Sequence, residues 1–123
     1  MENMECIFCG ETGYLEGKLL FSRFDKFPVS LGNALIVPRR HTENWFDLTK
    51  IEQDEVIDLM DKVKMLLDAE YAPDGYNIGM NCGLAAGQTI PYAHIHVIPR
   101  YINDMENPHG GVRGVISDEQ QYG

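Results

Sequence analysis

The sequence predicts an α+β protein: an antiparallel sheet with one long helix packed on it and an extended C-terminal tail. Two observations favour this class. One long segment has the spacing of an amphipathic helix, whereas the other apolar segments are short and bounded by turn residues, as strands are. The chain shows no βαβ unit, and 123 residues suffice for one domain with one core.

Two apolar segments precede the helix. Residues from Leu15 to Arg23 mix apolar and polar side chains in a way that suits one strand or two, with an exposed edge. Ala34 to Val37 has the composition of a short buried strand, which Pro38 stops. We expect both segments to join the strand at residues 92–100 in one sheet.

The helix is predicted to run from Lys50 to Tyr71. Thr49 and Glu52 have the spacing of a capping box at its start, and Pro73 to Gly75 ends it. Apolar residues recur along it at helical spacing: Val56, Met60, Val63 and Leu67, with Leu59 and Leu66 widening the stripe. Its acidic residues favour a solvated face over a metal site: Asp54, Glu55, Asp58 and Asp61.

After the helix, Tyr76 to Asn81 is predicted to pair with Tyr92 to Arg100, with Gly83 to Gln88 as the connecting loop. Periodicity is lost after Arg100. We therefore assign residues 1–102 to the domain and residues 103–123 to a glycine-rich tail of the same domain. Its Arg113 suits an anionic ligand, but an ordinary surface Arg on an exposed tail is the favoured interpretation.

The residues of greatest chemical interest lie in the last predicted strand. Because strand side chains alternate, Tyr92, His94 and His96 would share one face. A single His on a strand is usually structural, but two on one face would repel each other when protonated, which favours a functional site. Groups typical of a phosphate-binding loop lie just upstream: Asn81, Gly83, Gly87, Gln88 and Thr89.

Charge and hydropathy limit the partners. The chain has 19 acidic residues against 10 Lys plus Arg, for a formal charge of −9, and no basic run that could follow a nucleic-acid backbone. Nucleic acid is therefore not expected as the main partner. No apolar stretch reaches the length of a membrane span, and the acidic start lacks the features of a signal peptide, so we expect a cytoplasmic protein without a membrane partner.

Cysteine usage agrees with that compartment. Three Cys is an odd number, and Cys6 and Cys9 form a CxxC pair, so a disulfide framework is not expected. The pair is either a redox motif, which would be expected near a βαβ unit, or half of a zinc site. Cys82 is interpreted as a small buried thiol that is open to oxidation because it lies near the predicted site.

Taken in order, these segments resemble the histidine triad (HIT) family of nucleotide hydrolases and transferases, whose signature is His-x-His-x-His before apolar residues. The resemblance covers nearly the whole chain and implies a HIT-like fold. It differs at two positions: Tyr92 stands where the first triad His belongs, and Asn33 where many members carry another His. The matching segments include Cys6 to Cys9, Asp25 to Pro28, Leu35 to His41, Asp47 to Thr49, Asn81 with Gly83, Gly87 to Thr89, and His94 to Arg100.

The resemblance implies a mechanism. His94 would attack the α-phosphate of a purine nucleotide, such as an adenosine phosphoramidate or a dinucleoside polyphosphate, and form a nucleotidyl-histidine intermediate. His96 and Gln88 complete the expected catalytic set. Asp25 is assigned to the ribose by the same resemblance. The remaining expected substrate-binding residues are Asn81, Thr89 and Tyr92. Members of this type are homodimers, so we expect a homodimer.

The resemblance also bears on zinc. In members with this amino terminus a structural zinc ion is held by the two Cys, by the residue equivalent to His41 and by the first triad His. Here the set is Cys6, Cys9 and His41, with Tyr92, water, His109 or nothing as the fourth ligand, and a vestigial CxxC as the alternative. The chemistry itself requires no cofactor.

Two other functions remain open. The first is a catalytically weakened nucleotide-binding or scaffolding protein of the same fold, which Tyr92 and Asn33 favour and the intact His94 and His96 oppose. The second is an enzyme acting on adenylated DNA ends, which the acidic charge opposes.

Overall fold

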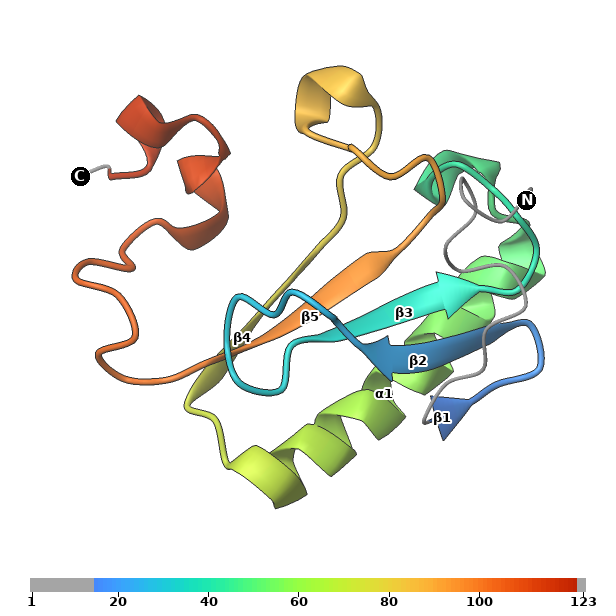
Figure 1. Cartoon of the computed structure of the whole chain (residues 1–123), viewed down its shortest axis with the longest axis horizontal. Helices are drawn as coiled ribbons and strands as arrows, with labels where there is room; N and C mark the ends of the chain where they lie inside the picture. The colour runs from blue at the N-terminus through green and yellow to red at the C-terminus, as the bar shows by residue number, and fades with distance from the viewer. Residues whose placement is uncertain (1–14, 122–123) are drawn as a thin grey trace.

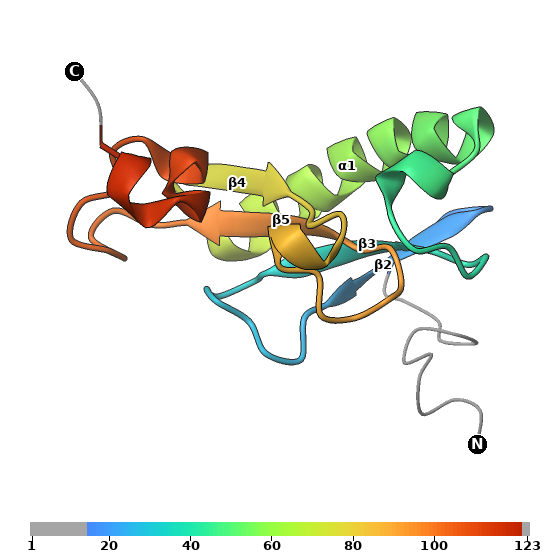
Figure 2. The same cartoon turned by 90° about the horizontal axis from the view of Figure 1, so that it is seen from above.

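The computed structural model describes residues 15–121, which form a five-stranded sheet with one long helix on one face (Figures 1 and 2). The strand order is β1-β2-β3-β5-β4, and every neighbouring pair is antiparallel, which confirms the predicted α+β class. The elements are β1 (Leu15–Glu16), β2 (Leu20–Phe24), β3 (Ala34–Pro38), α1 (Lys50–Tyr71), β4 (Gly75–Gly79) and β5 (Ile95–Arg100), with short 3-10 helices η2 (Trp45–Asp47), η3 (Leu84–Ala86), η4 (Gly111–Val115) and η5 (Ser117–Glu119).

Helix α1 has the predicted bounds. The Thr49 hydroxyl accepts a hydrogen bond from the Glu52 amide, and the Glu52 carboxylate accepts one from the Thr49 amide, so the capping box is formed. Ala72 ends the helix in the left-handed conformation. The buried stripe of the helix packs on the sheet in one core: Val56, Leu59, Val63 and Leu67 against Leu20, Ala34, Ile36, Ile95 and Val97.

The acidic exterior of α1 differs from the prediction at one residue. Asp54, Asp58 and Asp61 are exposed, as expected. Glu55 instead accepts hydrogen bonds from the backbone amides of Leu19 and Leu20, at 2.8 and 2.9 Å. Leu19 lies in the turn between β1 and β2, and Leu20 is the first residue of β2, so the carboxylate joins the end of that turn to the helix.

The pairing of β4 with β5 is as predicted, but both strands are shorter. β4 ends at Gly79, and β5 begins at Ile95 rather than at Tyr92. The cause lies in the backbone before β5, where the Ala93 amide donates to the Thr42 carbonyl and the Tyr92 amide to the Ile90 carbonyl. These bonds hold residues 92 and 93 outside the strand ladder, so the predicted shared face of Tyr92, His94 and His96 is wrong at Tyr92.

The tail after Arg100 is less extended than predicted. It contains η4 and η5 and is held to itself by side-chain bonds to its own backbone, such as Arg113 Nε to the Glu119 carbonyl at 2.9 Å. It lies beside the outer strand β4 (Figures 1 and 2). Between residues 15 and 121 no helix is both long and apolar enough to cross a membrane.

Candidate active site

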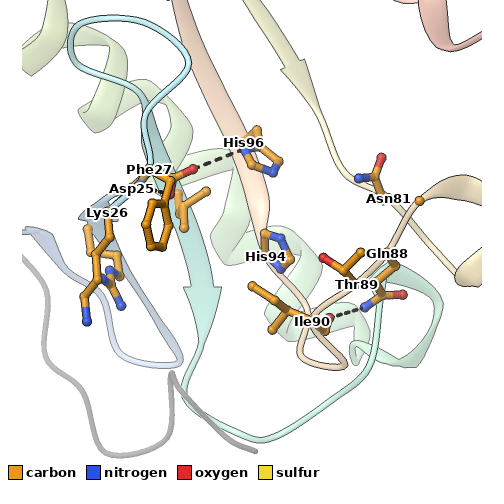
Figure 3. A pocket seen from close by; sticks show the side chains of 12 residues that line it. Asp25, Lys26, Phe27, Asn81, Gln88, Thr89, Ile90, His94 and His96 are labelled. Carbon is orange, nitrogen blue, oxygen red and sulfur yellow. Dashed lines mark hydrogen bonds and ion pairs between the residues drawn. The ribbon is translucent and has the colours of Figure 1, made fainter.

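A cavity of about 220 Å³ lies on the sheet face opposite α1 (Figure 3). The alternation along β5 decides the face: Ile95 and Val97 pack in the core against α1, so His96 between them points the other way. Six predicted site residues line the cavity: Asp25, Asn81, Gln88, Thr89, His94 and His96. Gly87 of the predicted phosphate-binding loop also lines the cavity. Five further lining residues were not singled out in the sequence: Arg23, Lys26, Phe27, Leu35 and Ile90.

His94 lies just before β5, at the centre of the cavity wall. Its Nδ1 atom is 2.8 Å from the backbone carbonyl oxygen of Tyr92. A carbonyl only accepts, so Nδ1 carries the proton, and in the neutral ring Nε2 carries the lone pair. The fold thus fixes the imidazole tautomer that a nucleophilic His needs.

His96 is the second imidazole of the site. Its ring centroid is 5.2 Å from that of His94, and its Nδ1 atom is 3.9 Å from a carboxylate oxygen of Asp25. Nδ1 is buried, and no described residue gives it a hydrogen bond. Burial and the neighbouring His94 lower the pKa of His96 below its ordinary 6.5, although Asp25 opposes the shift. The ring is therefore neutral at pH 7 in the ligand-free protein.

Gln88 ties down the loop that forms the opposite wall. Its side-chain oxygen accepts from the Gly83 amide at 2.8 Å, and its side-chain nitrogen donates to the carbonyls of Glu43 and Ile90 at 2.6 and 3.0 Å. Gly87 adopts φ +94° within this loop, a conformation that favours glycine. The amide of Gln88 therefore orders the segment that presents Thr89 to the cavity.

Asp25 stands at the end of β2, on the wall facing Thr89. One carboxylate oxygen accepts from the Phe27 amide at 3.0 Å, which fixes the turn after the strand. Asn33 stabilises the same loop. Its side-chain oxygen accepts a hydrogen bond from the Val29 amide, and its side-chain nitrogen donates one to the Ala34 carbonyl. Asn33, 1% exposed, therefore has a structural role.

Tyr92 does not line the cavity. Its side chain is 0% exposed and packs with Phe21, Leu35 and Val37. Its hydroxyl donates towards the backbone carbonyls of Pro38 and Arg39, at 2.8 and 3.1 Å. Burial raises the pKa of this hydroxyl, so it stays protonated. The structure thus does not bring the Tyr92 side chain to a substrate, contrary to the expectation for this residue.

The predicted zinc ligands are only partly placed. Cys6 and Cys9 lie outside the described residues, and the described part of the chain contains no group of three His, Cys, Asp or Glu side chains suited to a metal. His41 stacks on Tyr92 with ring centroids 4.5 Å apart and donates from Nε2 to the Pro91 carbonyl. The Tyr92 hydroxyl does not fit as the fourth ligand, because two backbone carbonyls accept its proton and burial raises its pKa, whereas zinc binds deprotonated ligands.

The chain is therefore an α+β protein in which two histidines, His94 and His96, lie beside a loop that contains Gly83 and Gly87. The model of the HIT domain family matches residues 12–103, and the chain belongs to that family.

The chain is similar to a named enzyme and to proteins whose names state no activity. The chain is 35% identical to an uncharacterized HIT-like protein of Methanocaldococcus jannaschii, covering 93% of this chain and 94% of the relative. It is 34% identical to the asymmetrical bis(5'-nucleosyl)-tetraphosphatase of Schizosaccharomyces pombe, covering 74% of this chain but only 50% of that enzyme. A crystal structure of a HIT family protein from Bacillus anthracis has a TM-score of 0.71 and 28% identity, covering 80% of this chain and 70% of that one.

Proposed function

We propose that this protein is a nucleotide hydrolase or nucleotidyl transferase in which His94 is the nucleophile. The observation that carries the proposal is the bond from His94 Nδ1 to the Tyr92 carbonyl oxygen, 2.8 Å long. It leaves the lone pair on Nε2 in a cavity that also holds a second imidazole, a hydroxyl and side-chain amides.

In the first step, a bond forms between His94 Nε2 and the α-phosphorus of a nucleotide, and the bond from phosphorus to the leaving group breaks. The leaving group, an amine or a phosphate oxygen, takes up a proton. In the second step water attacks the same phosphorus, and the bond from phosphorus to His94 Nε2 breaks. The proton that water loses returns to the group that protonated the leaving group, so the nucleoside monophosphate leaves and His94 is neutral again. An acceptor other than water gives nucleotidyl transfer instead.

His96 is suited to the proton transfer of the first step. Its pKa is low in the ligand-free cavity because the ring is buried beside His94. A phosphate group bound between the two rings brings negative charge to within a few ångströms, which raises the pKa of His96 again. The ring would then be charged where it can protonate the leaving group.

The other walls supply hydrogen bonds. Thr89 and Asn81 are exposed to the cavity and suit the non-bridging phosphate oxygens. Asp25, on the facing wall, suits the ribose hydroxyls, because a carboxylate accepts two hydrogen bonds at once. Gln88 lines the cavity, but both of its amide protons are donated to backbone carbonyls, so we propose that it acts by holding the Thr89 loop in place.

The relatives support this class of reaction, because the curated ones include the tetraphosphatase named above. We propose a dinucleoside polyphosphate, as this relative supports, or a nucleoside phosphoramidate such as that of adenosine, as the family resemblance implies, as the substrate class. A pure nucleotide-binding role gains no support from Tyr92, since its side chain belongs to the core while its carbonyl orients His94.

The test is release of AMP from adenosine phosphoramidate and from diadenosine tetraphosphate by the full chain and by a His94→Ala variant. We expect the variant to lose about a thousandfold or more in turnover, because the covalent route is closed, while the affinity for AMP changes by less than about threefold. Hydrolysis by the variant at a rate comparable to that of the parent protein would show that His94 is not the nucleophile.

We further propose a homodimer, as the family resemblance implies. β4 is an outer strand of the described sheet, so one of its backbone edges is not paired with another described strand. Sedimentation of the full chain at a mass of one subunit would contradict this.

A further inference from the structure

The cavity carries cations at the end away from its histidines. Arg23 and Lys26 line it there, on or just after β2, together with Phe27. They are two of only 10 Lys and Arg residues in a chain of net charge −9. Neither residue has a part in the proposed phosphoryl chemistry, and both lie where a part of the substrate remote from the phosphate would contact them.

The order of groups along the cavity assigns this end to the nucleobase. A phosphate attacked by His94 lies beside His96, whose Nδ1 is 3.9 Å from Asp25. With the ribose on Asp25, the base extends further from the histidines, towards Lys26 and Phe27 (Figure 3). This assignment, and all that follows from it here, rests on the proposed function.

The walls at this end suit a flat ring. The Phe27 side chain is 86% exposed, so its ring is accessible to a ligand, and the Asp25 carboxylate accepts a hydrogen bond from its backbone amide. Figure 3 shows its ring across the cavity from Ile90. A base between them would cover apolar surface on both of its faces.

The charged groups at this end can only donate hydrogen bonds. Arg23 is 9% exposed and held on β2, where its Nε donates to the Phe24 carbonyl, whereas Lys26 is exposed. Guanidinium and ammonium groups pair with the O6 and N7 acceptors of guanine. Adenine presents an exocyclic amine at the position of O6, and that amine is itself a donor.

We propose that Arg23 and Lys26 make this protein prefer nucleotides whose base carries a carbonyl oxygen at position 6, guanine and hypoxanthine, over adenine, with Phe27 stacking on the base. Arg23 and Lys26 would also attract a second phosphate group on the ribose. That phosphate, however, would lie against the Asp25 carboxylate, which repels it. A neutral acceptor on the base is compatible with both the carboxylate and the cations.

The experiment compares kcat/KM of the full chain for guanosine, inosine and adenosine 5'-phosphoramidates with the same leaving group. We expect guanosine and inosine to exceed adenosine by about tenfold, the size of one base-edge contact. Lys26→Met should reduce that ratio by several-fold and Arg23→Met should reduce it further, whereas Lys62→Met, an exposed lysine on α1, should leave it unchanged. Phe27→Ala should lower kcat/KM for all three substrates alike.

The outcomes separate this inference from the proposed function. An adenosine substrate used as well as or better than guanosine, while the protein still forms a nucleotidyl adduct on His94, would overturn the base preference alone. So would a ratio that Lys26→Met and Arg23→Met both leave unchanged. A 3'-phosphorylated adenosine substrate that outperforms guanosine would overturn it in favour of a second phosphate. Failure of every nucleotide to react would overturn both proposals.

Discussion

Tyr92 contributes to the site through its backbone carbonyl and to the core through its side chain. The carbonyl oxygen accepts from His94, while the hydroxyl donates to carbonyls at the end of β3. A tyrosine at this position therefore leaves the orientation of the proposed nucleophile intact. This residue-scale division of roles is why the departure from the family pattern is compatible with catalysis.

Removing the Tyr92 hydroxyl should cost stability. In Tyr92→Phe the buried carbonyl of Pro38 loses its donor, which we expect to lower the free energy of unfolding by about 1–2 kcal/mol. Tyr101→Phe is the matched control, because its hydroxyl donates to the Leu31 carbonyl in an exposed setting, and its effect should stay below about 0.5 kcal/mol. Urea unfolding that gives equal losses for the two variants would show that the buried bond contributes nothing of its own.

His96 should make the folded protein sensitive to acid. Its pKa is lowered in the folded state, so below the unfolded value near 6.5 the unfolded chain binds a proton that the folded chain resists. The free energy of unfolding should therefore fall as the pH drops through that value and level off below the folded pKa. The His96→Asn variant has no side chain that takes up this proton. Between pH 7.5 and pH 5.5, its free energy of unfolding in urea should therefore fall by less than that of the parent protein. A larger loss for the variant would mean that the folded pKa is raised instead.

Among single residues, those cavity residues that lie in one short segment could be predicted from the sequence. Gln88, Thr89, His94 and His96 are close in sequence, so a local pattern could identify them. Tyr92 was misplaced because its partners, the carbonyls of Pro38 and Arg39, are more than fifty residues away. Arg23 and Lys26 were not singled out in the sequence, because only the fold brings the end of β2 to the same cavity as the histidine segment.

At the scale of elements, the helix was the most predictable part. Its capping box and apolar stripe are local, and α1 has the predicted bounds. Strand ends were less predictable, because β5 starts only where its backbone can pair with β3 and β4, and the backbone at residues 92 and 93 is bonded elsewhere. The role of Glu55 also depends on a contact between distant elements.

Glu55 is expected to join α1 to the β1–β2 turn in solution. Glu55→Ala removes the acceptor of two backbone amides, and we expect a loss of about 2 kcal/mol in the free energy of unfolding. Asp58→Ala, at an exposed position on the same helix, should change stability by less than about 0.5 kcal/mol. Equal values for the two variants in thermal or urea unfolding would remove the structural role given to Glu55.

For the whole molecule, the fold places two loops from distant parts of the chain against each other over one sheet face. The turn after β2 contributes Asp25, and the loop before β5 contributes Thr89 and His94 (Figure 3). Core packing against α1 fixes the sheet that carries both. The predicted zinc ligands Cys6 and Cys9 lie outside the described residues, so zinc stays a prediction from the sequence.

The most direct measurement of the central claim is the mass of the intact protein after brief mixing with a nucleoside 5'-phosphoramidate, compared with the His94→Ala variant. We predict a nucleotidyl adduct in the parent protein that forms before the monophosphate is released and is absent from the variant. Guanosine and adenosine substrates should both be tried, so that a base preference is not mistaken for inactivity. Turnover without any adduct, or an equal adduct in the variant, would contradict the assignment of His94 as the nucleophile.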